Sequence, residues 1–592
     1  MSLQFYMGEP GSGKSTQLYK DVTEWAQRSP EKNFIFLVPD QYTMQAQIEI
    51  VKNSPNGGIM NVEVLSFMRL AHRVFEETGY MNGKIVLDDT GKSLVLRALA
   101  DSVSDRMPFL CANLNKVGFI HEIKSVISEL KQYDISPDGL DKLIDACGGQ
   151  GLLSMKLKDI KTVYCAFNDY TRSEYITTEE TTALLTEAVN HSRLIKNAVV
   201  IMDGFTGFTP VQYRLLQALL ELTSKVIITI TIDIDSSPYS MRGEQELFYL
   251  SKKTIKDIQM LSQQVNIRQD KDVLFKTALR YSENPELDHL QKHIFRYPIK
   301  KYDRPVENIV ITENNNIRDE INDVCLKIKE LVLEKGYAYR DMAIVCADLD
   351  SYADIFDECA QIHDIPFFID RNGKLKLNPF VEFILSALMI IKENYSYRSV
   401  MHFLRSGLCY AEREDIDEFD NYILKHGIKG RSRYAKLFAG VDGKTEEGAD
   451  ELEILNKVNE IRRSLMEGLE GLLEKPKCAS DYTKALRKLI SYYGIEEKLS
   501  EMKSVFDSSF EREKASEYAQ VYSLIMGLLS QIDDLLSDMP ISLEEFTAIL
   551  RSGIEEIDIG RIPGGIDRVI VGDITRSRIS NIKILFFTGV ND

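Results

Sequence analysis

The sequence MSLQFYMGEPGSGKST, residues 1–16, decides the fold of this chain. A short apolar strand leads directly into the pattern GxxxxGK[ST], a Walker A loop whose glycines let backbone N–H groups close around phosphate oxygens. Lys14 would reach the β- and γ-phosphates, and Ser15 can ligate Mg²⁺. Residues 16–28 read as a helix whose positive N-terminus faces the phosphates. A chance glycine-rich turn is the alternative, but the flanking strand and helix favour the loop. The nucleotide-binding candidates are Gly8, Glu9, Pro10, Gly11, Ser12, Gly13, Lys14, Ser15 and Thr16.

Length and composition indicate a large protein of ordinary polarity. The chain has 592 residues, enough for several domains, with 44% apolar and 27% charged residues and no apolar run of membrane-spanning length. No signal peptide precedes the first strand, and the eight cysteines lack the spacing of a zinc site. We therefore expect a cytoplasmic protein with reduced cysteines and no membrane contact. The net charge of −18 argues against indiscriminate nucleic-acid binding but is compatible with a narrow basic channel.

Apolar runs that alternate with helical segments predict two parallel sheets. In the first α/β unit, the strands expected after the P-loop strand are residues 33–39, 62–67, 197–203 and 225–233. In the second unit, the expected strands are residues 308–313, 342–346, 365–369, 568–571 and 582–588. The predicted fold class is α/β, with two RecA-like P-loop parallel-sheet domains that each carry a mainly helical insertion.

The predicted domain boundaries lie where alternating strand and helix segments give way to segments with helical periodicity alone. They are 1–78 and 195–300 for the first RecA-like domain, 79–194 for its insertion, 301–394 and 556–592 for the second RecA-like domain, and 395–555 for the second insertion. Because no helix follows the last expected strand to cover the sheet, we expect the sequence to be a fragment of a longer protein.

Several longer stretches resemble one protein family. Two α/β units with insertions at these places resemble a superfamily 1 helicase core, and the details are similar to the AddB (RexB) subunit family of AddAB-type helicase–nucleases, which process double-strand DNA breaks in bacteria. The similar stretches follow the family order over nearly the whole chain. They include GEPGSGKS, FLVPDQYTMQ (36–45), VLSFMRLAHRVF (64–75), MDGFTGFTPVQYRLLQAL (202–219), GYAYRDMAIV (336–345), IPFFIDRNGKLKLNPFVEFILSAL (365–388), HGIKG (426–430) and SRISNIKILFFTGVND (577–592).

The resemblance implies further site residues. The segments after the second and third strands look like those that line the path of single-stranded DNA. The DNA-binding candidates are Thr43, Ser66, Phe67, Arg69, Arg576 and Arg578. Core packing is the alternative for Phe67, and a plain surface role for Arg576 and Arg578. Asp203 is the expected Walker B ligand of Mg²⁺ together with Ser15, and Gln41 and Arg318 are further nucleotide-binding candidates, the latter in a segment loosely similar to an arginine finger.

Departures from an active motor point to a subunit that binds ATP without efficient turnover. An active helicase has Asp-Glu where this chain has Asp203-Gly204, so the acid that would activate the attacking water is missing. The strand ITITIDID (228–235) also lacks the Gly-Asp-x-x-Gln sensor, and no adenine-reading glutamine segment can precede a P-loop that starts at residue 8. We therefore assign no catalytic residue.

The leading hypothesis is a helicase-like subunit with an inactive motor. The resemblance implies ATP and Mg²⁺ as ligands, an AddA-like partner that supplies translocation, single-stranded and duplex-end DNA as substrates, and a part in recognition of the Chi sequence. The family's nuclease and its 4Fe-4S cluster are expected beyond Asp592. Two alternatives stay open: an autonomous DNA-stimulated ATPase in which Glu9 or Asp235 replaces the missing acid, and a small-molecule P-loop kinase.

Overall fold

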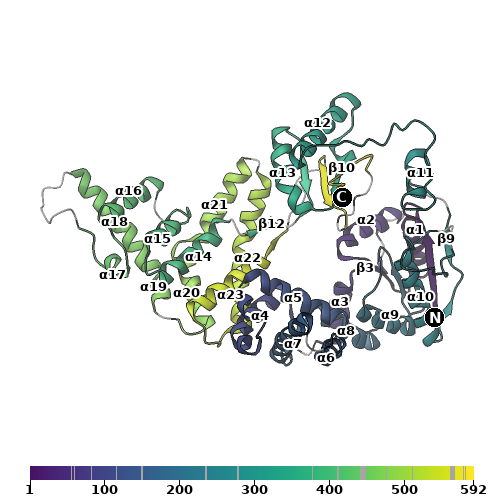
Figure 1. Ribbon diagram of the computed structural model, residues 1–592, viewed down its shortest axis with the longest axis horizontal. Coiled ribbons are helices and arrows are strands. Elements are labelled where there is room, and N and C mark those ends of the chain that lie inside the picture. Colours follow the sequence, from purple (N-terminus) through teal and green to yellow (C-terminus); the bar gives the residue numbers. More distant parts are fainter. Residues whose placement is uncertain are drawn as a thin grey trace.

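The structure is a computed structural model that describes most of the chain. It covers residues 1–591 except 55–56, 59, 82, 115, 149–150, 234–236, 277–278, 372, 376–377, 410–411, 440–448, 475, 510, 561–566, 576, 578 and 580–581. Figure 1 shows an α/β body that contains the N-terminus, a second α/β body near the C-terminus, and an elongated helical body that extends away from both. Among the described residues, no helix combines the length and the apolar character needed to cross a membrane.

The first α/β body is built on a seven-stranded sheet in which all pairings are parallel. Its strands are β1 (Ser2–Gly8), β2 (Phe34–Leu37), β3 (Val62–Leu65), β6 (Val199–Met202), β7 (Lys225–Thr231), β8 (Arg268–Gln269) and β9 (Val273–Phe275). The order is β3-β2-β6-β7-β1-β8, with β9 also beside β1. The strand β7 therefore separates the P-loop strand β1 from β6, and the carboxyl ends of the strands meet at one edge.

Both faces of this sheet are covered by helices, as an all-parallel sheet requires. One face packs on α1 (Lys14–Arg28) and α2 (Thr43–Asn53). The other packs on the helices α3 (Phe67–Thr78), α8 (Thr178–Ala188), α9 (Pro210–Leu222) and α10 (Tyr249–Gln264). Every residue of β2 and β6 is buried, which explains why these strands read as continuous apolar runs in the sequence.

The second α/β body has four parallel strands in the order β11-β14-β10-β15. They are β10 (Met342–Cys346), β11 (Phe367–Ile369), β14 (Val569–Asp573) and β15 (Ile584–Thr588). The helices α12 (Ile317–Lys335) and α13 (Leu349–Ile362) share a hydrophobic core with this sheet. On β15, Leu585 and Phe587 point away from that core and are 59% and 48% exposed.

The strand predicted at residues 308–313 is not formed, so that prediction was wrong. These residues have no strand partner and lie at the surface, where Val310 and Ile311 are 76% and 93% exposed. The backbone N–H groups of Glu307 and Asn308 donate to the Glu286 carboxylate instead. A β-branched run favours a strand only where a neighbouring strand can pair with it.

The helical body combines two parts of the chain that are far apart in sequence. The first part contains α4 (Asp89–Val103), α5 (Val117–Gln132), α6 (Pro137–Ala146) and α7 (Leu152–Thr171), with the two-stranded parallel sheet β4 (Ile85–Leu87) and β5 (Tyr175–Thr177). The second part contains α14 (Pro379–Lys392), α15 (Tyr397–Leu404), α16 (Arg413–Lys425), α17 (Arg431–Tyr434), α18 (Ala449–Gly468), α19 (Glu470–Leu473), α20 (Ala479–Tyr492), α21 (Ile495–Ser508), α22 (Arg512–Leu536) and α23 (Leu543–Glu556). A short antiparallel pair, β12 (Gly373–Lys374) with β13 (Asp558–Ile559), lies where the second part meets the second α/β body.

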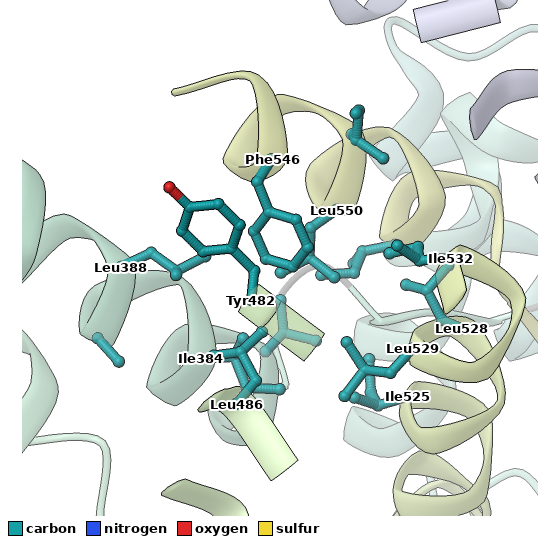
Figure 2. Packing of buried hydrophobic residues seen from close by; sticks show 14 of the residues in the cluster. Ile384, Leu388, Tyr482, Leu486, Ile525, Leu528, Leu529, Ile532, Phe546 and Leu550 are labelled. Carbon is teal, nitrogen blue, oxygen red and sulfur yellow. The ribbon is translucent and has the colours of Figure 1, made fainter. Parts of the chain in front are cut away.

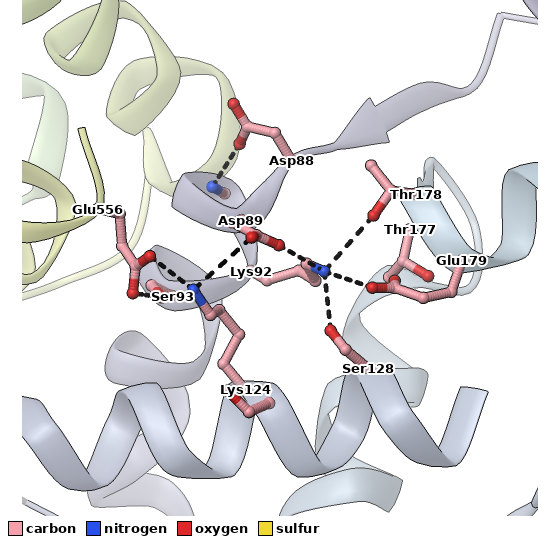
Figure 3. Close-up of polar contacts among 12 residues, drawn as sticks. Asp88, Asp89, Lys92, Ser93, Lys124, Ser128, Thr177, Thr178, Glu179 and Glu556 are labelled. Atoms are coloured by element: carbon pink, nitrogen blue, oxygen red, sulfur yellow. Dashed lines mark hydrogen bonds and ion pairs between the residues drawn. The ribbon is translucent and has the colours of Figure 1, made fainter. Parts of the chain in front are cut away.

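One continuous hydrophobic core joins the two parts. Figure 2 shows a section of it in which α14, α20, α22 and α23 contribute Ile384, Tyr482, Leu529 and Phe546. Polar contacts reinforce the junction. Glu556 at the end of α23 accepts hydrogen bonds from Lys124 at 2.5 Å and Ser93 at 3.0 Å (Figure 3). Burial would raise the pKa of Glu556, but its hydrogen bonds, that from Lys124 foremost, hold it below the ordinary value.

Candidate functional site

The P-loop connects β1 to α1 and needs glycine at three positions. Gly11 and Gly13 have φ angles of 74° and 84°, in the left-handed region that favours glycine. A Cβ atom at Gly8 would lie 2.6 Å from Ser12 Oγ. The side chain of Ser12 is buried, and its Oγ has no hydrogen-bond partner among the described residues. A buried hydroxyl without a partner fits a loop shaped to receive an additional oxygen atom.

Lys14 is buried at the first turn of α1 and is held by the loop itself. Its Nζ donates to the carbonyl oxygens of Gly8 and Glu9, each at 2.9 Å. Burial lowers the pKa of Lys14 to about 8, although the nearby Asp203 carboxylate opposes the shift. The charge of Arg280 lowers the pKa further, which places a second cation close to the loop. An anion bound here would favour the charged form of Lys14.

The two candidate metal ligands lie in direct contact. Ser15 Oγ donates to Asp203 Oδ1 at 2.9 Å, and Thr229 Oγ1 donates to the same oxygen at 2.6 Å. Asp203 directly follows β6 and is 2% exposed. A serine hydroxyl beside a buried carboxylate matches the oxygen ligands that Mg²⁺ prefers at a nucleotide. Together with the loop glycines and Lys14, this donor set fits ATP with Mg²⁺.

Gly204 directly follows Asp203, and the resemblance predicts that an active motor has its second carboxylate at this position. It has a φ of 82°, and a Cβ atom added there would lie 3.1 Å from the ring of Tyr42. The backbone is therefore built for glycine, and a glutamate would require Tyr42 to shift. Of the two acids considered as replacements, Glu9 accepts from Gln291 Nε2 at 3.3 Å and lies 3.9 Å from Arg296, while Asp235 is outside the described residues.

A segment that sequence reasoning missed lies against the P-loop. After β9, the backbone N–H groups of Leu279 and Arg280 donate to the Gly11 carbonyl at 3.0 and 3.1 Å. On the short helix α11 (Pro285–His293), Gln291 Nε2 donates to the Pro10 carbonyl at 2.9 Å. The pairing of β9 with β1 brings this segment to the loop, and Arg280 lies in no motif that would reveal such a long-range contact.

The outlying nucleotide candidates lie at the surface. Thr16 and Gln41 are exposed. Arg318, at the start of α12, forms a bidentate ion pair with Glu358 at 2.9 and 2.6 Å within the second α/β body. The structure therefore places Arg280 and Arg296 beside the P-loop, whereas the role predicted for Arg318 stays a prediction.

Some of the DNA-binding candidates have buried side chains, and others have exposed ones. Thr43 Oγ1 donates to the Asp40 carbonyl at 2.9 Å in the short 3₁₀ helix η1 (Asp40–Tyr42), and Ser66 Oγ caps α3 by accepting from the backbone of Arg69 at 3.4 Å. Both hydroxyl-bearing residues are buried. The side chain of Arg69 is exposed and free to approach a phosphate. Arg576 and Arg578 lie outside the described residues.

Several aromatic rings lie next to the DNA-binding candidate Phe67 at the same edge of the sheet. Phe67 is half-buried, with its ring centroid 5.2 Å from that of Phe205. Phe205 contacts Phe208 at 5.4 Å, and Phe208 contacts Tyr213 at 5.7 Å. Sequence reasoning missed Phe205 and Phe208, although their spacing of three residues in GFTGF after β6 is a usable signal. The P-loop, Asp203 and these residues all follow carboxyl ends of strands in one sheet, where ligands bind in open α/β folds.

The described part of the chain contains no metal cluster beyond the Ser15–Asp203 pair. No group of three or more His, Cys, Asp or Glu side chains in it could hold a metal ion, and all eight cysteines are free. The 4Fe-4S cluster expected beyond Asp592 therefore stays an expectation.

The sequence is similar to those of known proteins over its whole length. Residues 5–291 match the sequence family described as "ADDB, N-terminal". The chain is similar to proteins that are named as one subunit of an ATP-dependent helicase/deoxyribonuclease, with 37% identity over 604 residues in Lachnoclostridium phytofermentans, 32% over 603 residues in Clostridium kluyveri and 30% over 606 residues in Alkaliphilus metalliredigens. Each alignment covers 100% of this chain and 52% of the relative, so the chain spans about half the length of these relatives.

Proposed function

Because this chain belongs to the AddB family, we propose that it is the ATP-binding, helicase-like part of a subunit in a bacterial helicase–nuclease that processes double-strand DNA breaks. We further propose that its own motor does not hydrolyse ATP efficiently. The observation that carries the proposal is an intact phosphate-binding loop next to Gly204, which supplies no acid and has a backbone conformation that favours glycine.

The proposed core consists of two RecA-like domains of the superfamily 1 type. The order of the first sheet supports this assignment, because one strand separates the P-loop strand from the strand that Asp203 follows. The four parallel strands of the second α/β body, with α12 and α13 packed on one face, support a second domain of related design.

In this proposal, the chain's own residues bind ATP as a ligand. The loop N–H groups and Lys14 hold the phosphates, Arg280 adds a second positive charge, and Ser15 with Asp203 holds Mg²⁺. Bound ATP would supply a metal-complexed triphosphate whose cleavage needs an activated water molecule. With Gly204 in place of an acid, the site binds the phosphates but positions no base, and loss of a general base typically reduces a rate by about 10²–10⁴-fold.

Single-stranded DNA would follow the edge of the sheet beside the nucleotide. Arg69 would contact the backbone, and Phe67 with Phe205 would offer rings for base stacking. An AddA-like subunit would supply the active motor, and the nuclease and iron–sulfur cluster would lie in the remaining half of the relatives' length. Recognition of the Chi sequence at a duplex end and a cytoplasmic location complete the proposal.

Steady-state ATP turnover tests the mechanism. We expect the chain to bind ATP yet to hydrolyse it at the rate of the Lys14→Ala variant, with or without single-stranded DNA, because Gly204 supplies no base. The measurement compares phosphate release by both proteins, with nucleotide binding confirmed in parallel. Turnover that DNA stimulates and Lys14→Ala abolishes would contradict the inactive motor and favour the autonomous ATPase.

Replacement of Arg69 by alanine tests the DNA path. We expect weaker binding of single-stranded DNA and a salt dependence, log K against log salt concentration, that is shallower by about 0.7, the value for one lost phosphate contact. Arg73→Ala is the matched control, because Arg73 is exposed on the same helix but paired with Glu63 at 3.3 Å. Equal salt slopes for the two variants and the parent would remove Arg69 from the DNA path.

A further inference from the structure

The P-loop and its cations account for a triphosphate, but they leave open what receives the base. The side chain of Leu279 lies at the rim of the loop, because its Cδ1 is 3.1 Å from the position of a Cβ atom added to Gly13. The N–H of Leu279 is anchored to the Gly11 carbonyl at 3.0 Å, so the residue is fixed to the loop. Nevertheless, its side chain is 61% exposed.

An exposed leucine fixed beside a phosphate-binding loop has the properties of a ligand platform. Nucleotide pockets are lined mainly by apolar side chains, with a few polar groups that fix orientation. The loop N–H groups and Lys14 would bind the phosphates, so the rest of the nucleotide would extend past the rim of the loop. Contact with a flat base or a sugar would remove the exposed Leu279 side chain from water.

The amide nitrogens of two carboxamides near this rim already donate hydrogen bonds within the protein. Gln17, on the first turn of α1, donates to Asp21 Oδ1 at 2.7 Å. Gln291 Nε2 donates to the Pro10 carbonyl at 2.9 Å. Its Oε1 has no hydrogen-bond partner among the described residues, but this atom is buried away from solvent and from a base at the rim. A side chain that hydrogen-bonds a substrate group rejects analogues that lack the group by about 10⁴–10⁵-fold, whereas an apolar contact discriminates far less.

We propose that Leu279 is the platform on which the base of a nucleoside triphosphate packs at this P-loop, and that the site therefore accepts ATP and GTP with little discrimination. The inference rests on the proposed nucleotide-binding function and adds its substrate class, purine nucleoside triphosphates without base selection. Leu279 acts here as a binding residue through apolar contact alone.

Competition binding of ATP, GTP and inorganic tripolyphosphate, each with Mg²⁺, tests the platform. We expect ATP and GTP to bind the full chain with affinities within about tenfold of each other, and tripolyphosphate to bind about tenfold more weakly than ATP. The Leu279→Ala variant should bind ATP only as tightly as it binds tripolyphosphate. Its affinity for tripolyphosphate should equal that of the unaltered chain. Leu279→Tyr should keep ATP binding, because a ring can stack on the base. Leu250→Ala is the matched control, since Leu250 is 67% exposed on α10 of the same body.

Three results would overturn the platform. The first is an affinity for ATP that exceeds the affinity for GTP by more than about 100-fold. The second is a Leu279→Ala variant in which the difference in affinity between ATP and tripolyphosphate is unchanged. The third is a Leu250→Ala variant that loses as much affinity for ATP as Leu279→Ala does. A failure of the proposed function looks different, because neither ATP nor tripolyphosphate would then bind the unaltered chain, and both proposals would fall together.

Discussion

Replacement of Lys14 by alanine is expected to weaken ATP binding by at least about 100-fold, which corresponds to about 3 kcal/mol. The ammonium group is the one cation buried within the loop among the described residues, and hydrogen bonds to charged groups contribute about 1.5–3 kcal/mol each. Isothermal titration of ATP into both proteins measures the loss. Lys20→Ala is the control, because Lys20 lies on α1 with an exposed side chain and should leave the affinity unchanged.

The pH dependence of the same titration identifies the group. Burial lowers the pKa of Lys14 to about 8 in the free protein, so its charge is lost as the pH rises through that value. ATP binds the charged form. The affinity should therefore be nearly constant below pH 8 and fall above it by up to about tenfold per pH unit. The residual affinity of Lys14→Ala should lack this fall. A parent profile that stays flat from pH 7 to pH 9.5 would show that Lys14 does not titrate in this range.

Replacement of Phe383 by alanine is expected to cost about 3–5 kcal/mol of the free energy of unfolding of the helical body. The Phe383 side chain is fully buried on α14, and its ring centroid lies 4.7 Å from that of Phe403 and 5.5 Å from that of Tyr493. The alanine variant would leave a cavity among these rings. Chemical denaturation followed by far-ultraviolet circular dichroism measures the change.

The control for Phe383 lies on the same helix. Met389→Ala removes a side chain that is 36% exposed, so it should lower the free energy of unfolding much less than Phe383→Ala does. Equal losses for the two variants would mean that helix propensity in α14, rather than packing in the shared core, determines the stability of this body.

Local patterns were sufficient to predict five of the seven strands of the first sheet, whereas the short strands β8 and β9 were missed. The loop pattern predicted β1 and α1, and continuous apolar runs predicted β2, β6 and β7 within about two residues, because these strands are buried on both faces. The same reasoning failed at residues 308–313, where the composition favours a strand but no partner lies beside it. Strand formation depends on a neighbour that the local sequence does not specify.

The parts of the site that depend on distant contacts could not be predicted. Arg280 and Leu279 reach the P-loop only because β9 pairs with β1, more than 260 positions away in the sequence. Thr43 and Ser66 were predicted as phosphate contacts from resemblance, and only the structure showed that their hydroxyl groups bond to the backbone. Side-chain chemistry identified the candidates, but the fold decides which of them face a ligand.

The shared core of the helical body has a consequence for synthesis on the ribosome. Ser93 and Glu556, which meet at its junction, are separated by 463 positions. Translation at about 5–20 residues per second therefore takes about 20 to 90 s to deliver the second half of this core after the first has emerged. During that interval, the parts of the apolar faces of α4 and α5 that pack on α22 or α23 in the complete fold have no partner, and they are the surfaces on which a chaperone would act in the nascent chain.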